Sequence, residues 1–243
     1  MDTVTIRTAG STAALSYARQ SLMNIGCRFG EDATHLLLPV PSFEPTGNIK
    51  GGGDLSQLLA NLDKNVVIMG GVLDRPELKE YTCIDFLKDP MYTAQNAKIT
   101  AHCALRLAMN NLPVILDGEK ALVIGWGRIG KCLAQLLKAT GAQVTVAARK
   151  ETDRVMLKAL GYDAVDTNDL DTTPYRVIFN TVPQMLCPDC PGKGLKIDLA
   201  SKLGLGGDDV IWARGLPGKD APQSSGHLIA QTAYRFIYGK EHL

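Results

Sequence analysis

Three glycines in the middle of the chain constrain its fold more than any other feature. Gly125, Gly127 and Gly130 form a G-x-G-x-x-G pattern that follows the apolar run ALVI and precedes the amphipathic stretch KCLAQLLKATGA. In such a strand-to-helix turn the first glycine makes the tight turn, the second admits a pyrophosphate and the third lets helix and strand pack closely. The helix N-terminus offers unpaired N–H groups to the phosphates. The pattern predicts a dinucleotide site, and a glycine-rich turn without a ligand is the alternative.

The residue at the end of the next strand indicates which dinucleotide binds. An acid about 20 residues beyond the loop bonds the ribose 2′-hydroxyl of NAD, whereas an arginine there suits a 2′-phosphate. Arg149 stands 19 residues after Gly130, and Lys150 follows it. Arg128, inside the loop, can help to neutralise the same phosphates. We therefore expect NADP(H) as the cofactor; the alternative is that Arg149 is a solvated surface charge.

Helix-like and strand-like segments alternate along the whole chain. Before residue 95 the pattern predicts helices at 13–25 and 55–65 and strands at 35–43 and 66–73. A helix with Thr100 at its capping position comes next, then a βαβ series with strands ending at 149, 183, 201 and 214, and finally a helix at 227–240. We expect an α/β protein with a Rossmann-type doubly wound parallel sheet and a second, smaller flavodoxin-like α/β domain. The small domain would take residues 1–98 and 223–243, and the NADP-binding domain 99–222.

Composition narrows the class of protein. The 243 residues carry a net charge of +1 and no basic block, so nucleic acid is not an expected partner. The N-terminus has no apolar core of the signal-peptide kind, and no apolar run approaches about 18 residues, so we expect a soluble cytoplasmic protein without a membrane partner. The six cysteines are scattered and are expected to be free thiols.

Five segments, taken together, resemble one family. NAKITAHCALRLA, VIGWGRIGKCLAQLLKATGAQVTVAAR, FNTVP, IDLAS and GLPGKDAPQSSG occur in the order and near the spacing of the A-type subunit of dipicolinate synthase, over roughly residues 96–239. The resemblance implies a dehydrogenase-like enzyme that works with a flavoprotein-like B-type subunit. Together they would oxidise a dihydrodipicolinate-type intermediate of the lysine and diaminopimelate pathway to dipicolinate in sporulating cells.

The chain also departs from the family pattern. The family's T-A-E-G-A reads T-A-H-C-A at 100–104, and KLGLGGDD follows IDLAS in place of a shorter K-P-G-G pattern. The family's first strand, with its turn rich in Gly and Asp, is not recognised at the start of the chain. These departures indicate a divergent, N-terminally short member.

The expected cofactor residues come from the loop, the end of the second strand and the ends of two later strands. They are Gly125, Trp126, Gly127, Arg128, Ile129, Gly130, Arg149, Lys150, Thr181, Val182, Pro183, Leu199, Ala200 and Ser201. Trp126 is expected to pack over the cofactor entry, and Pro183 could instead be a plain strand terminator. Asp198 is expected either near the nicotinamide or as an acceptor for loop amides.

The expected substrate site binds a small dicarboxylate. Lys219 and Ser225 would hold one carboxylate, with Ser224 and Ser225 capping the last helix, and the start of the Thr100 helix would hold the other. His102, placed in the first turn of that helix, would have a lowered pKa and act as a neutral base. The expected substrate-binding residues are Asn96, Thr100, Gly218, Ser224 and Ser225, and the expected catalytic residues are His102 and Lys219. An ordinary loop lysine and a satisfied core histidine are the alternatives.

Other interpretations of the site and of the function stay open at this point. Cys187 and Cys190 form a single C-x-x-C without further ligands, so two loop thiols and no metal site are expected. An NADP-dependent dehydrogenase of a hydroxyacid or shikimate type is the second enzyme hypothesis. A non-catalytic NADP(H)-binding protein is the third. A homo-oligomer is expected, together with the B-type partner.

Overall fold

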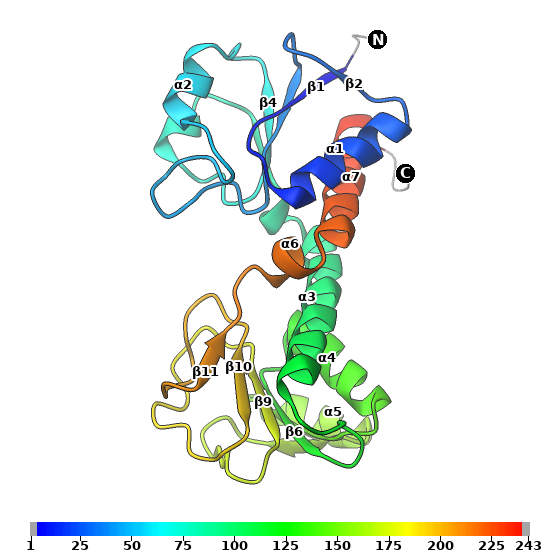
Figure 1. The fold of residues 1–243 in the computed structure, drawn as a ribbon, viewed down its shortest axis with the longest axis vertical. Helices are drawn as coiled ribbons and strands as arrows, with labels where there is room; N and C mark the ends of the chain where they lie inside the picture. Colours follow the sequence, from blue (N-terminus) through cyan, green and yellow to red (C-terminus); the bar gives the residue numbers. More distant parts are fainter. Residues whose placement is uncertain (1–3, 240–243) are drawn as a thin grey trace. The chain divides into compact units, whose positions relative to one another are not determined.

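The computed structural model describes residues 4–239, and the chain divides into two compact units (Figure 1). Unit 1 takes the residues up to Asn96 and those from Pro217 onward, and unit 2 takes Ala97–Leu216. Residues 240–243, the end of the expected C-terminal segment, lie outside the described residues.

Unit 1 contains a five-stranded parallel sheet in the order β2-β1-β3-β4-β5. This is the flavodoxin-like order, in which the chain starts near the middle of the sheet and adds strands to both sides. Its strands are β1 (Thr5–Thr8), β2 (Arg28–Phe29), β3 (His35–Leu37), β4 (Val67–Gly70) and β5 (Cys83–Asp85). No strand was predicted at the start of the chain, but β1 lies there, between β2 and β3, and pairs with both.

Two long helices of unit 1 pack against each other. They are α1 (Ala13–Asn24), whose N-cap is Thr12, and α7 (Pro222–Tyr238), which ends at Gly239 in the left-handed region. A Cβ on Gly226 of α7 would lie 2.4 Å from the Ala14 carbonyl oxygen and 2.5 Å from the Tyr17 Cβ. The two backbones therefore meet at a separation that only glycine permits.

Other helices of unit 1 are short. They are α2 (Leu55–Ala60), the 3-10 turns η1 (Pro76–Leu78) and η2 (Phe86–Lys88), and α6 (Leu216–Asp220), which begins at the last residue of unit 2. Leu36, Leu38, Ile49, Ile68 and Tyr81 are among the buried residues of a core cluster in this unit.

Helix α3 (Pro90–Asn111) begins earlier than expected and runs from unit 1 into unit 2. Asp89 caps it by accepting hydrogen bonds from the Met91 N–H (3.4 Å) and the Tyr92 N–H (3.0 Å), and it also pairs with Arg235 of α7. The expectation that Thr100 caps a helix is therefore wrong. The helix begins ten residues before Thr100, where Asp89 provides the cap and Pro90 the first helical residue. Thr100 therefore lies in the middle of α3, where it is buried.

Unit 2 contains a six-stranded parallel sheet in the order β11-β10-β9-β6-β7-β8. Numbered within the unit, this is the Rossmann order with its reversal between β6 and β9, so the expected fold class is confirmed. Its strands are β6 (Lys120–Ile124), β7 (Gln143–Ala147), β8 (Asp163–Val165), β9 (Val177–Asn180), β10 (Leu195–Asp198) and β11 (Val210–Trp212). The strand β8 was not expected from the sequence.

Two amphipathic helices connect the first three strands of this sheet. They are α4 (Arg128–Ala139), after β6, and α5 (Glu151–Ala159), after β7. Both helices begin at the carboxyl end of a strand, so their N-termini lie at the same edge of the sheet as the Gly-rich loop. Leu122, Ile124, Ala147, Ile178 and Leu205 belong to a buried cluster of this unit.

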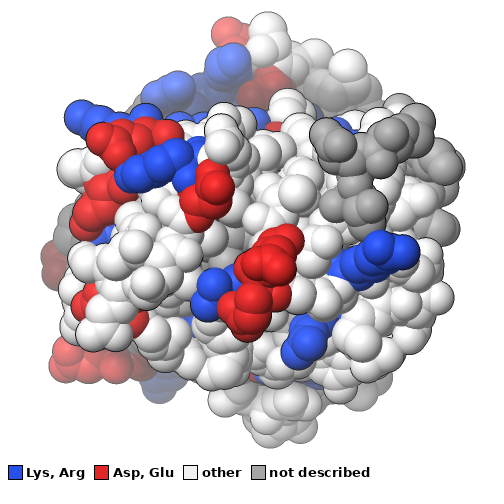
Figure 2. Space-filling model, turned by 90° about the horizontal axis from the view of Figure 1, so that it is seen from above, with Lys and Arg blue, Asp and Glu red and all other residues white. Residues whose placement is uncertain are grey.

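The surface carries both signs of charge. On the face shown in Figure 2, Lys and Arg side chains lie among Asp and Glu side chains and wide uncharged areas. Within the described residues, no helix has the length and apolar character that crossing a membrane requires.

The Gly226 contact leads to a stability prediction. Gly226→Ala should lower the free energy of unfolding by about 2–3 kcal/mol, because the new methyl group would force α1 and α7 apart. Chemical denaturation followed by far-UV circular dichroism measures this. Gly218→Ala is the control, since a Cβ there meets nothing within 4 Å. Equal stability of the two variants would contradict the close helix contact.

Candidate functional site

The candidate site lies where the strand order of unit 2 reverses. β6 and β9 are parallel neighbours with Ile124 opposite Asn180, so the loops that follow them leave the sheet side by side. Thr181 donates from its backbone N–H and from its hydroxyl to the Ile124 carbonyl oxygen, at 2.9 Å in each case. In open α/β sheets this switch point is where ligands bind.

Each glycine of the loop meets a different steric demand. Gly125 has a φ of +105°, and a Cβ there would lie 2.4 Å from Thr181 Oγ1. A Cβ on Gly130 would lie 2.0 Å from the Gly125 carbonyl oxygen, so the helix can approach the loop only without a side chain. A Cβ on Gly127 would meet nothing within 4 Å, and that open space leaves the backbone accessible.

The N-terminus of α4 fits a phosphate group. Gly127 is its N-cap and makes no side-chain cap hydrogen bond, so the first backbone N–H groups of the helix have no capping acceptor from that residue. Arg128 is exposed and Ile129 half-buried in the first turn. Unpaired N–H groups, the positive end of the helix dipole and an arginine together favour an anion.

A pocket of about 250 Å³ adjoins this loop. It is lined by Gly125, Trp126, Ala148, Arg149, Lys150, Asp153, Thr167, Val182, Gln184 and Leu186. Five of the expected cofactor residues therefore line one cavity, from the Gly-rich loop, the segment after β7 and the segment after β9. The other five lining residues were not predicted, because none of them belongs to a recognised motif: Ala148, Asp153, Thr167, Gln184 and Leu186.

Trp126 has one aromatic and one cationic neighbour. Its ring meets Tyr162 edge-on with the centroids 6.0 Å apart, and the Lys131 ammonium lies 5.6 Å from its centroid. Burial raises the pKa of Tyr162. Because Trp126 also lines the pocket, its fluorescence can report on a ligand there.

Asp198 is a buried acceptor for neighbouring amides. Its carboxylate accepts hydrogen bonds from Asn180 Nδ2 (2.9 Å) and from the N–H groups of Ala200 (2.9 Å), Gly204 (2.7 Å) and Leu205 (3.1 Å). Asn180 also exchanges two 3.0 Å hydrogen bonds with the backbone of Val182. Of the two expectations for Asp198, the structural one agrees with these contacts, and the residue holds the loops after β9 and β10 in place.

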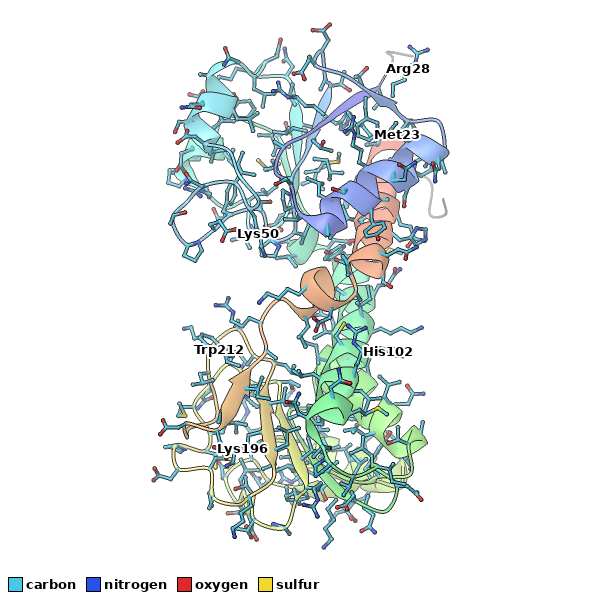
Figure 3. The ribbon with its side chains drawn as sticks, in the orientation of Figure 1. Met23, Arg28, Lys50, His102, Lys196 and Trp212 are labelled. Atoms are coloured by element: carbon cyan, nitrogen blue, oxygen red, sulfur yellow. The ribbon has the colours of Figure 1, made fainter. Side chains whose placement is uncertain are left out.

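The remaining expected cofactor residues follow these two strands. Leu199 and Ala200 are buried, Ser201 and Pro183 are exposed, and the Ala200 carbonyl accepts a 3.0 Å hydrogen bond from the indole of Trp212 (Figure 3). Thr181 touches the Gly-rich loop as described above. These segments border the carboxyl edge of the sheet but, apart from Val182, do not line the pocket.

The expected substrate residues are distributed over both units. Thr100 and His102 belong to unit 2, and Asn96, Gly218, Lys219, Ser224 and Ser225 belong to unit 1. His102 is exposed and lies well inside α3, so its predicted place in the first turn of a helix is wrong (Figure 3). The start of a helix at Thr100 cannot hold a carboxylate for the same reason.

The segment expected as a loop before the last helix is itself helical. Gly218 and Lys219 are exposed residues of α6, and the N-cap of α7 is Ala221. The expected capping by Ser224 and Ser225 is therefore wrong, because both lie inside α7, with Ser225 buried. Pro222 begins the helix, as is common for proline.

Comparisons with known proteins agree with this geometry. Residues 94–184 match the family model described as D-isomer specific 2-hydroxyacid dehydrogenase, NAD binding domain. The chain is 27% identical over 157 residues to the A-type subunit of dipicolinate synthase from Bacillus subtilis (strain 168), with 58% of this chain and 53% of that protein covered. Over these residues the chain is similar to the A-type subunit of dipicolinate synthase. The match thus spans about half the length of this curated relative.

Solved structures of dipicolinate synthase A-type subunits have the same fold as this chain. The A-type subunit of dipicolinate synthase from Bacillus halodurans superimposes with a TM-score of 0.84 at 19% identity, covering 97% of this chain and 98% of that one. The corresponding chain of dipicolinate synthase from Bacillus subtilis gives 0.78 at 19% identity, covering 98% and 97%. The family resemblance is confirmed, and the NAD-binding domain supports a dehydrogenase with a nicotinamide cofactor.

The C-x-x-C pair lies beyond the pocket loop. Cys187 and Cys190 are buried free thiols, and burial together with the neighbouring Cys187 raises the pKa of Cys190 to about 11. Lys196 (Figure 3) is buried nearby on β10 and donates to Asp209 at 2.6 Å. Within residues 4–239, no group of three or more His, Cys, Asp or Glu side chains could hold a metal ion.

Removing the Asp198 carboxylate should destabilise unit 2. Asp198→Ala leaves four donors without their acceptor, so we expect a loss of about 3 kcal/mol in the free energy of unfolding. Urea denaturation followed by tryptophan fluorescence measures it, since both tryptophans lie in unit 2. The exposed Asp208→Ala is the matched control and should change stability by less than about 0.5 kcal/mol. A similarly small loss for both variants would contradict the assigned role.

The raised pKa of Cys190 predicts slow alkylation. At pH 8 a thiol of pKa about 11 carries about a hundredfold less thiolate than one at its ordinary value of 9.0. Pulsed iodoacetamide labelling with peptide mass spectrometry should show Cys190 reacting slowly in the folded protein and faster as pH rises toward 11. The urea-unfolded chain provides the control. Equal labelling rates in the folded and unfolded protein at pH 8 would rule this out.

Proposed function

We propose that the protein is a cytoplasmic NADP-dependent oxidoreductase that oxidises a dihydrodipicolinate-type intermediate to dipicolinate. The pocket wall formed by Arg149 and Lys150 at the end of β7 carries the cofactor part of this proposal. The substrate class rests on the similarity to the A-type subunit of dipicolinate synthase. The partners proposed are a flavoprotein-like B-type subunit of the synthase and a further copy of this chain.

Different residues of the chain would bind different parts of the cofactor. The N-terminus of α4 and Arg128 would bind the pyrophosphate, and Arg149 with Lys150 would pair with the 2′-phosphate. The segment after β9, with Thr181, Val182 and Pro183, would contact the ribose and phosphate region. One charge-assisted bond is worth about 1.5–3 kcal/mol, which corresponds to at least about a tenfold preference for NADP(H) over NAD(H). When bound, the nicotinamide supplies the acceptor for the hydride that leaves the substrate.

The substrate would present two carboxylates and release one proton with each hydride. Gly218, Lys219, Ser224 and Ser225 belong to unit 1, and their expected part in binding a carboxylate stays a prediction. The exposed imidazole of His102 on α3 is proposed to take up the proton, and the expected substrate contact of Asn96, in unit 1, stays a prediction. Leu199, Ala200 and Ser201 would border the nicotinamide at the end of β10.

Nucleotide titration tests the cofactor assignment. In a Trp212→Phe background, where Trp126 is the remaining tryptophan, NADPH should quench fluorescence at about tenfold lower concentration than NADH. Arg149→Ala should remove this preference by weakening NADPH binding alone. Lys158→Ala, an exposed lysine away from the pocket, should leave both affinities unchanged. Equal affinity for the two nucleotides in the unsubstituted pocket would contradict NADP specificity.

Turnover then tests the substrate. Oxidation of a dihydrodipicolinate-type substrate with NADP⁺ should be detectable and should increase when a B-type subunit is added. Oxidation of 2-hydroxy acids or shikimate instead would favour the second enzyme hypothesis, which the matched NAD-binding domain of 2-hydroxyacid dehydrogenases also fits. NADPH binding without oxidation of any of these substrates would favour a non-catalytic role.

A further inference from the structure

An arginine that the sequence analysis did not single out makes several contacts next to the pocket. Arg154 lies on α5, and its Nη1 donates to the carbonyl oxygens of Ala148 and Arg149, at 2.8 Å in each case. The same nitrogen lies 2.7 Å from Asp166 Oδ2. The side chains of Arg154 and Asp166 are only 22% and 23% exposed, so this is not a loose surface pair.

The contacts of Arg154 join two walls of the pocket. Ala148 and Arg149 belong to the wall at the end of β7, and Asp166 directly precedes Thr167, which lines the pocket from the segment after β8. The Ala148 N–H also donates to the Val165 carbonyl oxygen at 3.0 Å. One guanidinium therefore fixes both the direction of the chain at Arg149 and its distance from the segment after β8.

All three contacts of Arg154 involve one nitrogen, Nη1. Nη1 carries two hydrogens, which the two carbonyl oxygens and the Asp166 carboxylate share, and the planar guanidinium holds it at a distance that the shorter, flexible side chain of a lysine does not reproduce. Arg149, in contrast, is exposed, and only its backbone carbonyl takes part in this arrangement. The side chain of Arg149 thus remains available to a ligand while its backbone is held.

We propose that Arg154 and Asp166 form a positioning pair that directs Arg149 and Lys150 toward the 2′-phosphate and so determines the preference for NADP(H). The inference rests on the proposed function, because it concerns how that cofactor is selected. Arg154 acts through the backbone of Arg149 and does not itself contact the phosphate.

The Asp166→Asn variant separates positioning from direct contact. If Arg154 bound the phosphate itself, removal of the competing Asp166 charge would leave NADPH binding unchanged or make it tighter. If Arg154 acts by position, loss of the ion pair loosens the turn, and NADPH binds more weakly. The two roles therefore predict different outcomes for a single substitution.

Dissociation constants for NADPH and NADH, measured by tryptophan quenching on the full chain, give the test. Arg154→Lys and Asp166→Asn should each weaken NADPH binding about tenfold and leave NADH binding unchanged. In an Arg149→Ala background, Arg154→Lys should have little further effect, because its action passes through Arg149. Arg176→Lys is the matched control, since Arg176 pairs with Glu119 at 3.2 Å away from the pocket.

Each result bears on the proposal. Parallel weakening of both nucleotides, or tighter NADPH binding in Asp166→Asn, would overturn it. If Arg154→Lys does not fold, as judged by circular dichroism, Asp166→Asn and its combination with Arg149→Ala decide alone. A preference for NADPH that Arg149→Ala removes but neither Arg154→Lys nor Asp166→Asn changes would refute the positioning role and leave the proposed cofactor standing. No preference for NADPH in the unsubstituted protein would overturn both.

Discussion

The pair of hydrogen bonds from Thr181 to the Ile124 carbonyl holds together the two loops on which the candidate site depends. Ile124 is the last residue of β6 and Thr181 the first after β9. These bonds therefore join the ends of the two strands between which the strand order reverses. They also bring the Thr181 side chain so close to Gly125 that no Cβ fits there. The glycines of the loop are thus a steric consequence of this contact and of the close approach of α4, as well as a provision for a ligand.

At this edge of the sheet one charged residue is buried and has a structural role, and another is exposed on the pocket wall. Asp198 is fully buried and its acceptor capacity is taken up by four donors, so it stabilises the loops without contributing to the surface of the pocket. Arg149 is exposed at the end of β7, on the pocket wall. Asp153 also lines this wall, so the field inside the pocket is that of a basic pair with one acidic neighbour.

The sequence predicted those parts of the structure that depend on local chemistry. The Gly-rich loop, α1, α4 and the parallel α/β character of both units follow from glycine placement and apolar periodicity, which act within a few residues. β1 was missed because TIRT alternates small polar residues with one isoleucine and one arginine and has no apolar run. The start of α3 carried a recognisable signal, Asp89 followed by Pro90, which the helical pattern after Thr100 obscured. The roles of Asp198 and Arg154 could not be predicted, since each depends on partners brought together only by the fold.

The path of the chain has a consequence for the order in which it can fold during synthesis. Unit 1 is discontinuous, because α7 packs against α1 although all of unit 2 separates them in the sequence. The ribosome therefore completes the Rossmann sheet, whose residues are contiguous, while the sheet of unit 1 still lacks the helix that covers α1. Until α7 is made, the face of α1 that meets Gly226 is open to water and to other chains. Helix α7 thus emerges after all of unit 2 and completes the first unit of the chain.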